Sequence, residues 1–378
     1  MVRFLAFLLV FLHHILPYGG SPRLDSFLGA FAPVYYAFAH ACRFGLSLFF
    51  TLSAFLICEL LLREREAAGA VGVKQFYIRR ILRIWPLYYL ALALGVVFAF
   101  LPGGEAATVA KLGWFAIFMG AWYQASQGVL NNPANPLWSI SVEEVFYVFA
   151  PWVVKYFSRK SLYGFCVAIA VIANVSLFYL ARTGTTNNFI WFNYFVQFEC
   201  FAGGILLCLF LRGQAPQITV QHRLILVSGC CIFWMIAASG QLYRSVYYPS
   251  GSTGGWILIS SYALATLGCV MLLAAFLGVS PKLLPGWAIY LGRISFGLYV
   301  YHDFSIFIVY YIPIRAILSQ AGMIYPLYAI LSAVLTIGLP LGLTLLAAAL
   351  SYRYFETPFL KMKKRHSVID SQPIQGAN

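Results

Sequence analysis

Apolar residues fall in long runs along the chain, with short polar segments between them. A membrane-spanning helix needs about 20 mostly apolar residues, or fewer where the bilayer adapts. On this basis we predict ten spans, at residues 4–18, 44–62, 84–101, 138–157, 161–181, 191–211, 224–240, 256–278, 286–312 and 326–352. The apolar segment 111–123 is too short to span comfortably, and we interpret it as re-entrant or interfacial. A true span there would instead reverse the orientation of everything that follows.

The composition supports the same class. Of the 378 residues, 62% are apolar and only 10% are charged, and the mean hydropathy is +0.82. A soluble domain would be about half apolar and about a quarter charged. The sequence therefore predicts an all-α, polytopic integral membrane helical bundle over residues 1–358, followed by a disordered basic tail at 359–378. No long polar stretch remains for a soluble catalytic domain, so any chemistry must occur within the membrane domain or at its faces.

The net charge of +14 could by itself indicate a nucleic-acid partner. However, the 25 Lys and Arg residues lie mostly in short loops between apolar runs, which is the pattern that orients membrane helices. With ten spans and a cytoplasmic N-terminus, 17 of them fall on the cytoplasmic side and six on the other, while Arg293 and Arg353 fall within spans. We therefore expect both termini in the cytoplasm and no nucleic-acid partner.

The first apolar run has the basic start and apolar centre of a signal peptide, but no small-x-small cleavage site follows it. We expect it to be a retained helix. The eight cysteines form no CxxC pair, and we interpret them as small core residues. The six histidines lack metal-ligand spacing, so no metal is expected.

Ionisable groups inside spanning helices are costly and usually mark a substrate path or a site. The opening helix carries Arg3 and His14, which are 11 residues apart. Steps of about 100° bring these two residues to within about 20° of one face, about 16 Å apart along the axis, while His13 projects about 100° away. The simpler interpretation is an orienting arginine at one membrane edge and an interfacial histidine at the other.

A second cluster, FYIRRILRIWPLYYL, places Arg79, Arg80 and Arg83 at the cytoplasmic end of the third predicted span. The positive-inside pattern explains one or two arginines at such a position. Three within five residues would also make a clamp for phosphate groups, because guanidinium binds phosphate bidentately.

The segment NNPANPLWSISVEEVFYVFAPWV leads from a proline-broken loop into a helix that carries Trp138, Ser139, Glu143, Glu144 and Tyr147. The adjacent glutamates project about 100° apart and cannot form a paired-carboxylate site, whereas Glu143 and Tyr147 share a face. We expect one of the carboxylates to pair with an arginine or histidine of another helix.

Late in the chain, GRISFGLYVYHD places Ser295, Tyr299 and His302 on one stripe of a span. In SYRYFETPFL, Arg353 and Glu356 are spaced for an interfacial ion pair, and Pro358 is expected to stop the helix. The small residues of FGLSLFFTLSAFLI (44–57) are interpreted as positions of close helix packing.

These segments supply six short motifs in a fixed order along the chain. The motifs are Arg, ten residues and His; GxSxFFxxS; R-x-x-R before a proline and tyrosines; LWS-x-S-V-E-E-x-F-Y; S-x-G-x-Y-x-x-H; and S-Y-x-x-x-E-x-P. Together they resemble the acyltransferase family 3 membrane proteins, which O-acylate carbohydrates and related acceptors. The resemblance runs from Arg3 to Pro358. Two departures are Ala54, where the family usually has glycine, and Asp303, where proline is common. We expect no counterpart of the extra C-terminal hydrolase-like domain that some members carry, so transfer is expected to finish within the membrane domain.

The resemblance implies that the protein lies in a bacterial inner membrane, in contact with membrane lipid, and takes an acetyl or other short acyl group from cytoplasmic acetyl-CoA. The acceptor would be a carbohydrate hydroxyl at the outer face, such as a surface polysaccharide, a lipopolysaccharide sugar or a glycan precursor. Arg79, Arg80 and Arg83 would then bind the donor. Arg3, His14 and Glu143 would be catalytic. Arg3 and His14 would line the path, with His14 as general base or acyl-receiving residue, and Glu143 would orient it or balance its charge. The expected substrate-path residues are Trp138, Ser139, Tyr147, Ser295, Tyr299 and His302.

Two other classes stay open at this point. A transporter of a sugar or lipid would also need buried charges and a path, although no duplicated halves are evident in the sequence. A non-catalytic assembly or sensor protein would leave the arginines, His14 and Glu143 without a common use. The sequence leaves the acceptor, the oligomeric state, and direct transfer versus a covalent intermediate open.

Overall fold

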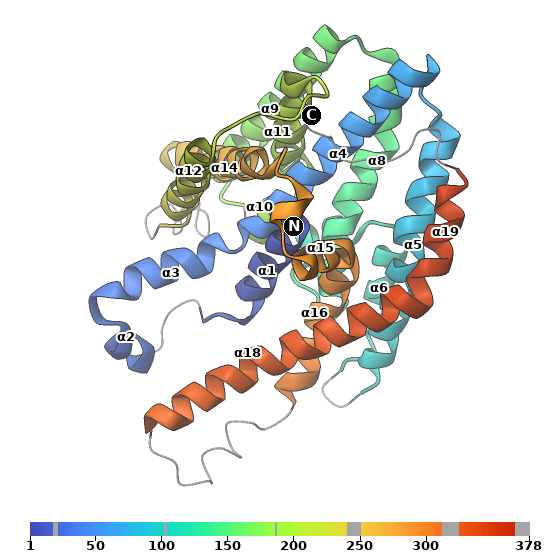
Figure 1. Ribbon diagram of the computed structural model, residues 1–378. Coiled ribbons are helices and arrows are strands. Elements are labelled where there is room, and N and C mark those ends of the chain that lie inside the picture. Colours follow the sequence, from blue (N-terminus) through green and yellow to red (C-terminus); the bar gives the residue numbers. More distant parts are fainter. Residues whose placement is uncertain (18–21, 102–103, 186, 240–250, 312–324, 367–378) are drawn as a thin grey trace.

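The computed structural model describes residues 1–17, 22–101, 104–185, 187–239, 251–311 and 325–366, and every element in these ranges is helical (Figure 1). Eight of the described helical segments, some of which join consecutive helices, are long and apolar enough to cross a membrane. They are Leu24–Ala68, Val73–Ala99, Asn135–Tyr156, Arg159–Arg182, Asn188–Leu211, Val220–Ala238, Thr253–Phe276 and Leu331–Lys363. The prediction of an all-α multi-pass membrane protein is confirmed.

Two of the ten predicted spans are not among these eight segments. The first is α1 (Val2–Ile15), with only 14 residues. The predicted span 286–312 is divided into α15 (Gly286–Arg293) and α16 (Ser295–Tyr310), because the backbone at Ile294 (φ −89°, ψ 7°) leaves the helical region. Hydropathy cannot reveal such a break, since both halves are apolar. α1 packs against both α15 and α16, so this break lies beside the first helix.

The predicted re-entrant segment is divided into two short helices, α6 (Thr108–Ala116) and α7 (Gly120–Gln127). Between them, Phe118 adopts a positive φ of 58°, which ends the first helix. Neither helix is among those long and apolar enough to cross a membrane.

The central helix is α4 (Phe44–Ala68), which packs against α1, α8 (Trp138–Tyr156), α11 (Tyr194–Leu211) and α14 (Gly251–Phe276). Close packing against α1 depends on Gly45, where a Cβ would lie only 2.7 Å from the Ala6 carbonyl oxygen. Ala54, the departure from the family pattern, is fully buried and faces Gly204 of α11. The absent side chain of Gly204 therefore accommodates the extra methyl group.

The other helices complete the bundle, with α2 and α3 forming an arm to one side (Figure 1). Their bounds are α2 Pro22–Leu28, α3 Ala32–Ala41, α5 Val73–Ala99, α9 Arg159–Arg182, α10 Asn187–Trp191, α12 Val220–Ala238, α18 Tyr325–Leu350 and α19 Thr357–Lys364, with 3₁₀ turns at Gly29–Phe31, Asn135–Leu137 and Pro281–Leu283. α5 begins well before the predicted span at 84–101, so all three clustered arginines lie within it.

The expectations for the C-terminal end are wrong in two respects. After α18, a π-helical turn (Ser351–Glu356) leads directly into α19, which packs against α5. Pro358 lies at the start of α19, where its fixed φ and missing N–H are tolerated, so it does not stop the helix. Residues 359–364 are therefore helical rather than a disordered tail, and residues 367–378 lie outside the described part of the chain.

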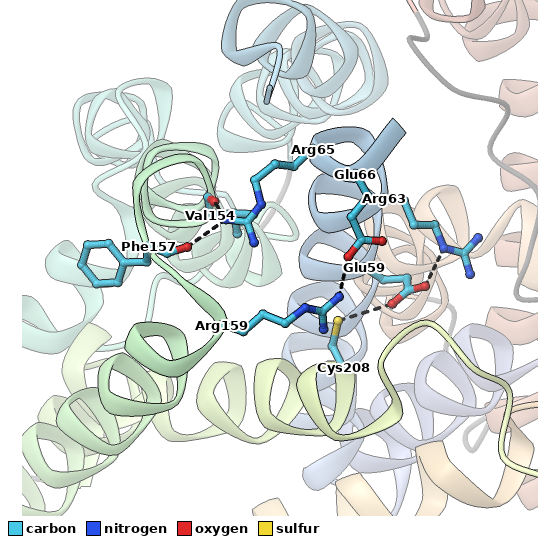
Figure 2. A network of polar contacts seen from close by, with 8 residues as sticks. All are labelled: Glu59, Arg63, Arg65, Glu66, Val154, Phe157, Arg159 and Cys208. Carbon is cyan, nitrogen blue, oxygen red and sulfur yellow. Dashed lines mark hydrogen bonds and ion pairs between the residues drawn. The ribbon is translucent and has the colours of Figure 1, made fainter. Parts of the chain in front are cut away.

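Figure 2 shows a polar network at the C-terminal end of α4. Arg65 Nη1 donates to the carbonyl oxygens of Val154 and Phe157 at 2.6 and 2.8 Å, and so caps the end of α8. Arg159 pairs with Glu66 at 2.5 Å and ties the start of α9 to the same end of α4. The carboxylate of Glu59 accepts hydrogen bonds from the other two members of the network, Arg63 and Cys208. These charged residues connect helices and do not line a cavity, so we assign them a structural role.

Candidate functional site

A cavity of about 80 Å³ lies beside the start of α1 and is bordered by α4, α5, α8 and α16. Three arginines and one carboxylate contribute to its wall. Its polar lining consists of Arg3, Ser53, Arg80, Arg83, Ser139, Glu143, Tyr147, Ser295 and Tyr299. We call it the arginine cavity. Eight of these nine residues were predicted as site residues from the sequence, and Ser53 was not.

Hydrogen bonds fix the single carboxylate of this cavity. Tyr147 donates to Glu143 Oε2 at 2.7 Å, and the Tyr147 hydroxyl lies 2.6 Å from Ser53 Oγ. The Arg80 guanidinium lies 5.6 Å from the centre of the Tyr147 ring. Its buried Nε has no hydrogen-bond partner among the described residues. Three guanidinium groups around one carboxylate leave the cavity with excess positive charge, and a buried donor of Arg80 is available to an anion.

Arg79 does not belong to this cavity. It is 3% exposed, and its Nη2 donates to Glu64 Oε2 at 2.7 Å, while its Nη1 donates to the carbonyl oxygen of His366 at 3.0 Å. Glu64 is fully buried and also accepts from the Gly72 backbone N–H at 2.9 Å. The structure therefore divides the predicted arginine clamp: Arg80 and Arg83 face the cavity, and Arg79 forms a buried ion pair.

A second cavity, of about 230 Å³, lies beside the other end of α1. Aromatic rings and side-chain amides dominate its wall. Its lining includes His13, His14, Arg43, Asn135, Trp138, Asn188, Trp191, Tyr262 and Tyr299. We call it the histidine cavity. The Arg43 guanidinium stacks on the Trp191 ring, 3.9 Å from its centre, so that even the cation here is placed by an aromatic side chain.

The two cavities share part of their walls. Leu46 and Tyr299 line both of them. The Tyr299 hydroxyl donates to the Pro136 carbonyl oxygen at 3.0 Å and lies 2.6 Å from Ser139 Oγ, which holds the ring in place. Since Arg3 lines one cavity and His14 the other, α1 extends from the first cavity to the second, in agreement with the shared helical face predicted from their spacing.

The surroundings of His14 differ from those expected. Glu143 lies in the arginine cavity, hydrogen-bonded to Tyr147, and the carboxylate opposite His14 is that of Asp303 on α16. The distance from His14 Nδ1 to Asp303 Oδ1 is 3.9 Å. In the sequence, Asp303 stood out only as a departure from the family pattern. An acidic residue directly after a histidine, inside a span, was the available signal.

The cluster around His14 also contains His302, whose ring centre lies 5.0 Å from that of His14. The metal-ligand atoms of His14, His302 and Asp303 all lie within 4.8 Å of one another, a set that could hold a metal ion. Ligand nitrogens around a bound zinc ion are much closer, about 3.3 Å apart in a tetrahedral site. The set is looser than a formed zinc site, and the expectation of no metal stays a prediction.

The family model described as an acyltransferase domain matches residues 1–345. The chain belongs to acyltransferase family 3. It is 24% identical over 343 residues to the peptidoglycan O-acetyltransferase OatA of Listeria monocytogenes, with 84% of this chain and 51% of that protein covered. It is likewise 24% identical over 342 residues to the O-acetyltransferase OatA of Staphylococcus aureus, with 84% and 52% covered.

The chain thus spans about half the length of these curated relatives. No solved structure gives a significant match to it. Within the family's membrane domain, the structure brings most of the predicted residues to two places. Ser139, Tyr147 and Ser295 line the arginine cavity, Trp138 lines the histidine cavity, and Tyr299 lines both.

His302 lines neither cavity and is fully buried behind His14. The wall residues Ser53 and Arg43 were not predicted from the sequence. Ser53 was interpreted as a small packing residue, and its hydroxyl is instead a partner of Tyr147. Arg43 lies just before a predicted span, where a basic residue is ordinarily explained by topology.

Proposed function

We propose that this protein is an integral O-acyltransferase of a bacterial inner membrane, with both termini in the cytoplasm. It takes an acetyl or other short acyl group from acyl-CoA at the arginine cavity and transfers it to a carbohydrate hydroxyl at the histidine cavity. One observation carries the proposal: α1 places Arg3 in one cavity and His14 in the other, and the two cavities share Leu46 and Tyr299. Family membership supports the same reaction class.

The arginine cavity suits the anionic head of coenzyme A. Arg3, Arg80 and Arg83 supply guanidinium groups for phosphate oxygens, and the buried Nε of Arg80 is a donor without a partner among the described residues. Coenzyme A supplies the acyl group as a thioester, which has an activated carbonyl carbon. Arg79 is left out of the donor site because Glu64 already neutralises it.

His14 is placed to act as a general base. Its neutral imidazole takes the proton of the acceptor hydroxyl as the hydroxyl oxygen bonds to the acyl carbon. It returns the proton to the sulfur as the carbon–sulfur bond breaks. One ester and one thiol are formed, and His14 ends the reaction as it began. Arg3 contributes to donor binding at the opposite end of the same helix.

The histidine cavity suits a sugar. The rings of Trp138 and Trp191 offer flat apolar faces, while Asn135 and Asn188 offer amide donors and acceptors for hydroxyl groups. A relative is named as a peptidoglycan O-acetyltransferase, so cell-wall glycan joins surface polysaccharide and lipopolysaccharide sugars among the acceptors to be tested.

The test is mass spectrometry of surface glycans from cells with the wild-type protein, with His14→Ala, and without the protein. We expect a gain of one acetyl mass that requires both the protein and His14. The matched control is His222→Ala, which removes an imidazole at the start of α12, outside both cavities. Identical glycans in all three strains, with equal protein abundance in the membrane, would contradict acyl transfer and favour a sugar or lipid transporter.

A further inference from the structure

His14 is flanked by two side chains of α16, Asp303 and His302. Asp303 Oδ1 lies 3.9 Å from His14 Nδ1, and the two side chains are 19% and 31% exposed. This distance is longer than a hydrogen bond, which needs about 2.7–3.2 Å. Catalytic hydrogen bonds are often long before substrate binds and tighten in the reacting complex. A small adjustment of either side chain would therefore complete the contact.

In the His14 imidazole, protonation of the nitrogen that faces Asp303 determines whether the other nitrogen can accept a proton. A carboxylate opposite Nδ1 favours a proton on Nδ1, since an ionised carboxylate only accepts hydrogen bonds. The lone pair of His14 is then on Nε2, which is the tautomer that a general base needs toward a hydroxyl in the histidine cavity.

His302 cannot take the place of Asp303. Its Nδ1 lies 2.5 Å from the Tyr299 carbonyl oxygen, which only accepts, so its proton is on Nδ1 and its lone pair on Nε2. That Nε2 is buried and has no hydrogen-bond partner among the described residues. A neutral imidazole offers no negative charge to a protonated His14. Within the described part of the chain, Asp303 is the carboxylate within ion-pair distance of His14.

We propose that Asp303 is the positioning residue of His14. It accepts the Nδ1–H, fixes the tautomer that leaves Nε2 free for the acceptor, and balances the charge of His14 while His14 holds the acceptor proton. Asp303 keeps its own charge throughout, because the proton moves only from the acceptor oxygen to His14 and then to the sulfur. The effect on rate rests on the proposed acyl transfer, whereas the effect on the His14 imidazole does not.

The test compares Asp303→Asn, Asp303→Glu and wild type in purified full-length protein, with Asp25→Asn as the matched control. Asp25 bonds to Tyr36 and lines neither cavity. We expect Asp303→Asn to lower kcat for acyl transfer by about 10- to 100-fold, up to the lower limit of the 10²- to 10⁴-fold contributed by a general base, with the donor and acceptor KM unchanged. Asp303→Glu should recover part of the lost rate, because it restores the carboxylate.

A second readout does not depend on activity. Diethyl pyrocarbonate acylates neutral imidazole nitrogens, and mass spectrometry of the His14 peptide gives its rate of modification. Without the carboxylate at Nδ1, Nε2 is a weaker nucleophile, so Asp303→Asn should slow modification of His14 by about 3- to 10-fold while His222 reacts as before. If Asp303→Asn does not accumulate in the membrane, Asp303→Ser serves in its place.

The outcomes separate the two proposals. If His14 in Asp303→Asn is modified at the wild-type rate, the positioning role is overturned, whatever happens to acyl transfer. A raised KM with unchanged kcat also overturns it, because Asp303 would then bind substrate. Slowed modification in a protein whose wild type shows no transfer supports the positioning role and contradicts the proposed function.

Discussion

The arginine cavity and the histidine cavity lie at opposite ends of one helix and differ in size and in chemistry. The first is about 80 Å³ and has three guanidinium groups in its wall. The second is about 230 Å³ and is lined by rings and amides. Charge selects a ligand by its anionic groups at long range, whereas rings and amides select by shape and hydroxyl pattern. Under the proposed function, this contrast predicts that binding of the donor and reaction with the acceptor can be changed separately.

The largest expected effect separates chemistry from donor binding. His14→Ala should lower the rate of acyl transfer by about 10²- to 10⁴-fold, because a general base is removed. Donor affinity, measured by titration calorimetry, should stay at the wild-type value, since the arginine cavity is intact. Loss of both the transfer rate and the donor affinity in His14→Ala would mean that the two cavities do not act separately.

The second-largest effect is expected at the buried ion pair of Arg79 and Glu64. Arg79→Leu leaves the fully buried carboxylate of Glu64 without its partner and should destabilise the protein by about 3–5 kcal/mol. A thermal unfolding scan in detergent should show a clearly lower midpoint. Donor KM in the protein that remains folded should not change. An unchanged midpoint with a raised donor KM would return Arg79 to the donor site.

Charge reversal within the arginine cavity should act on binding alone. The double variant Arg80→Glu and Arg83→Glu should raise donor KM by at least about 10- to 100-fold, since the loss of even one charge-assisted hydrogen bond costs about 1.5–3 kcal/mol. The loss should be greatest at low donor concentration. Arg182→Glu, on the exposed end of α9, is the control. A loss independent of donor concentration would make these arginines structural.

The smallest expected effect lies in the wall of the histidine cavity. Trp191→Leu should raise acceptor KM by about 2- to 10-fold, because one aromatic contact is worth about 0.5–1.5 kcal/mol. Initial rates at varied acceptor concentration would measure it, with donor KM as the internal control. A change in donor KM instead would show that the cavities bind the opposite partners.

Much of this arrangement could be predicted from the sequence because it depends on periodicity. Helical geometry alone places Arg3 and His14 on one face, and hydropathy identifies the long spans. The break at Ile294 could not be predicted, since it leaves the apolar pattern unchanged, and the helical α19 could not be predicted because its lysine-rich sequence has no continuous apolar run. The division of the arginines depends on which helices pack around α5. The pairing of Asp303 with His14 depends on contacts between helices that are distant in the sequence.

The wall shared by the two cavities has a consequence for the cell. Tyr299 has its hydroxyl already engaged by Pro136 and Ser139, and Leu46 beside it is apolar. Neither side chain therefore offers an unengaged polar group that could relay a proton from one cavity to the other. In the proposed transfer, the acyl group would cross this wall without opening a path for protons, and the membrane would stay electrically tight.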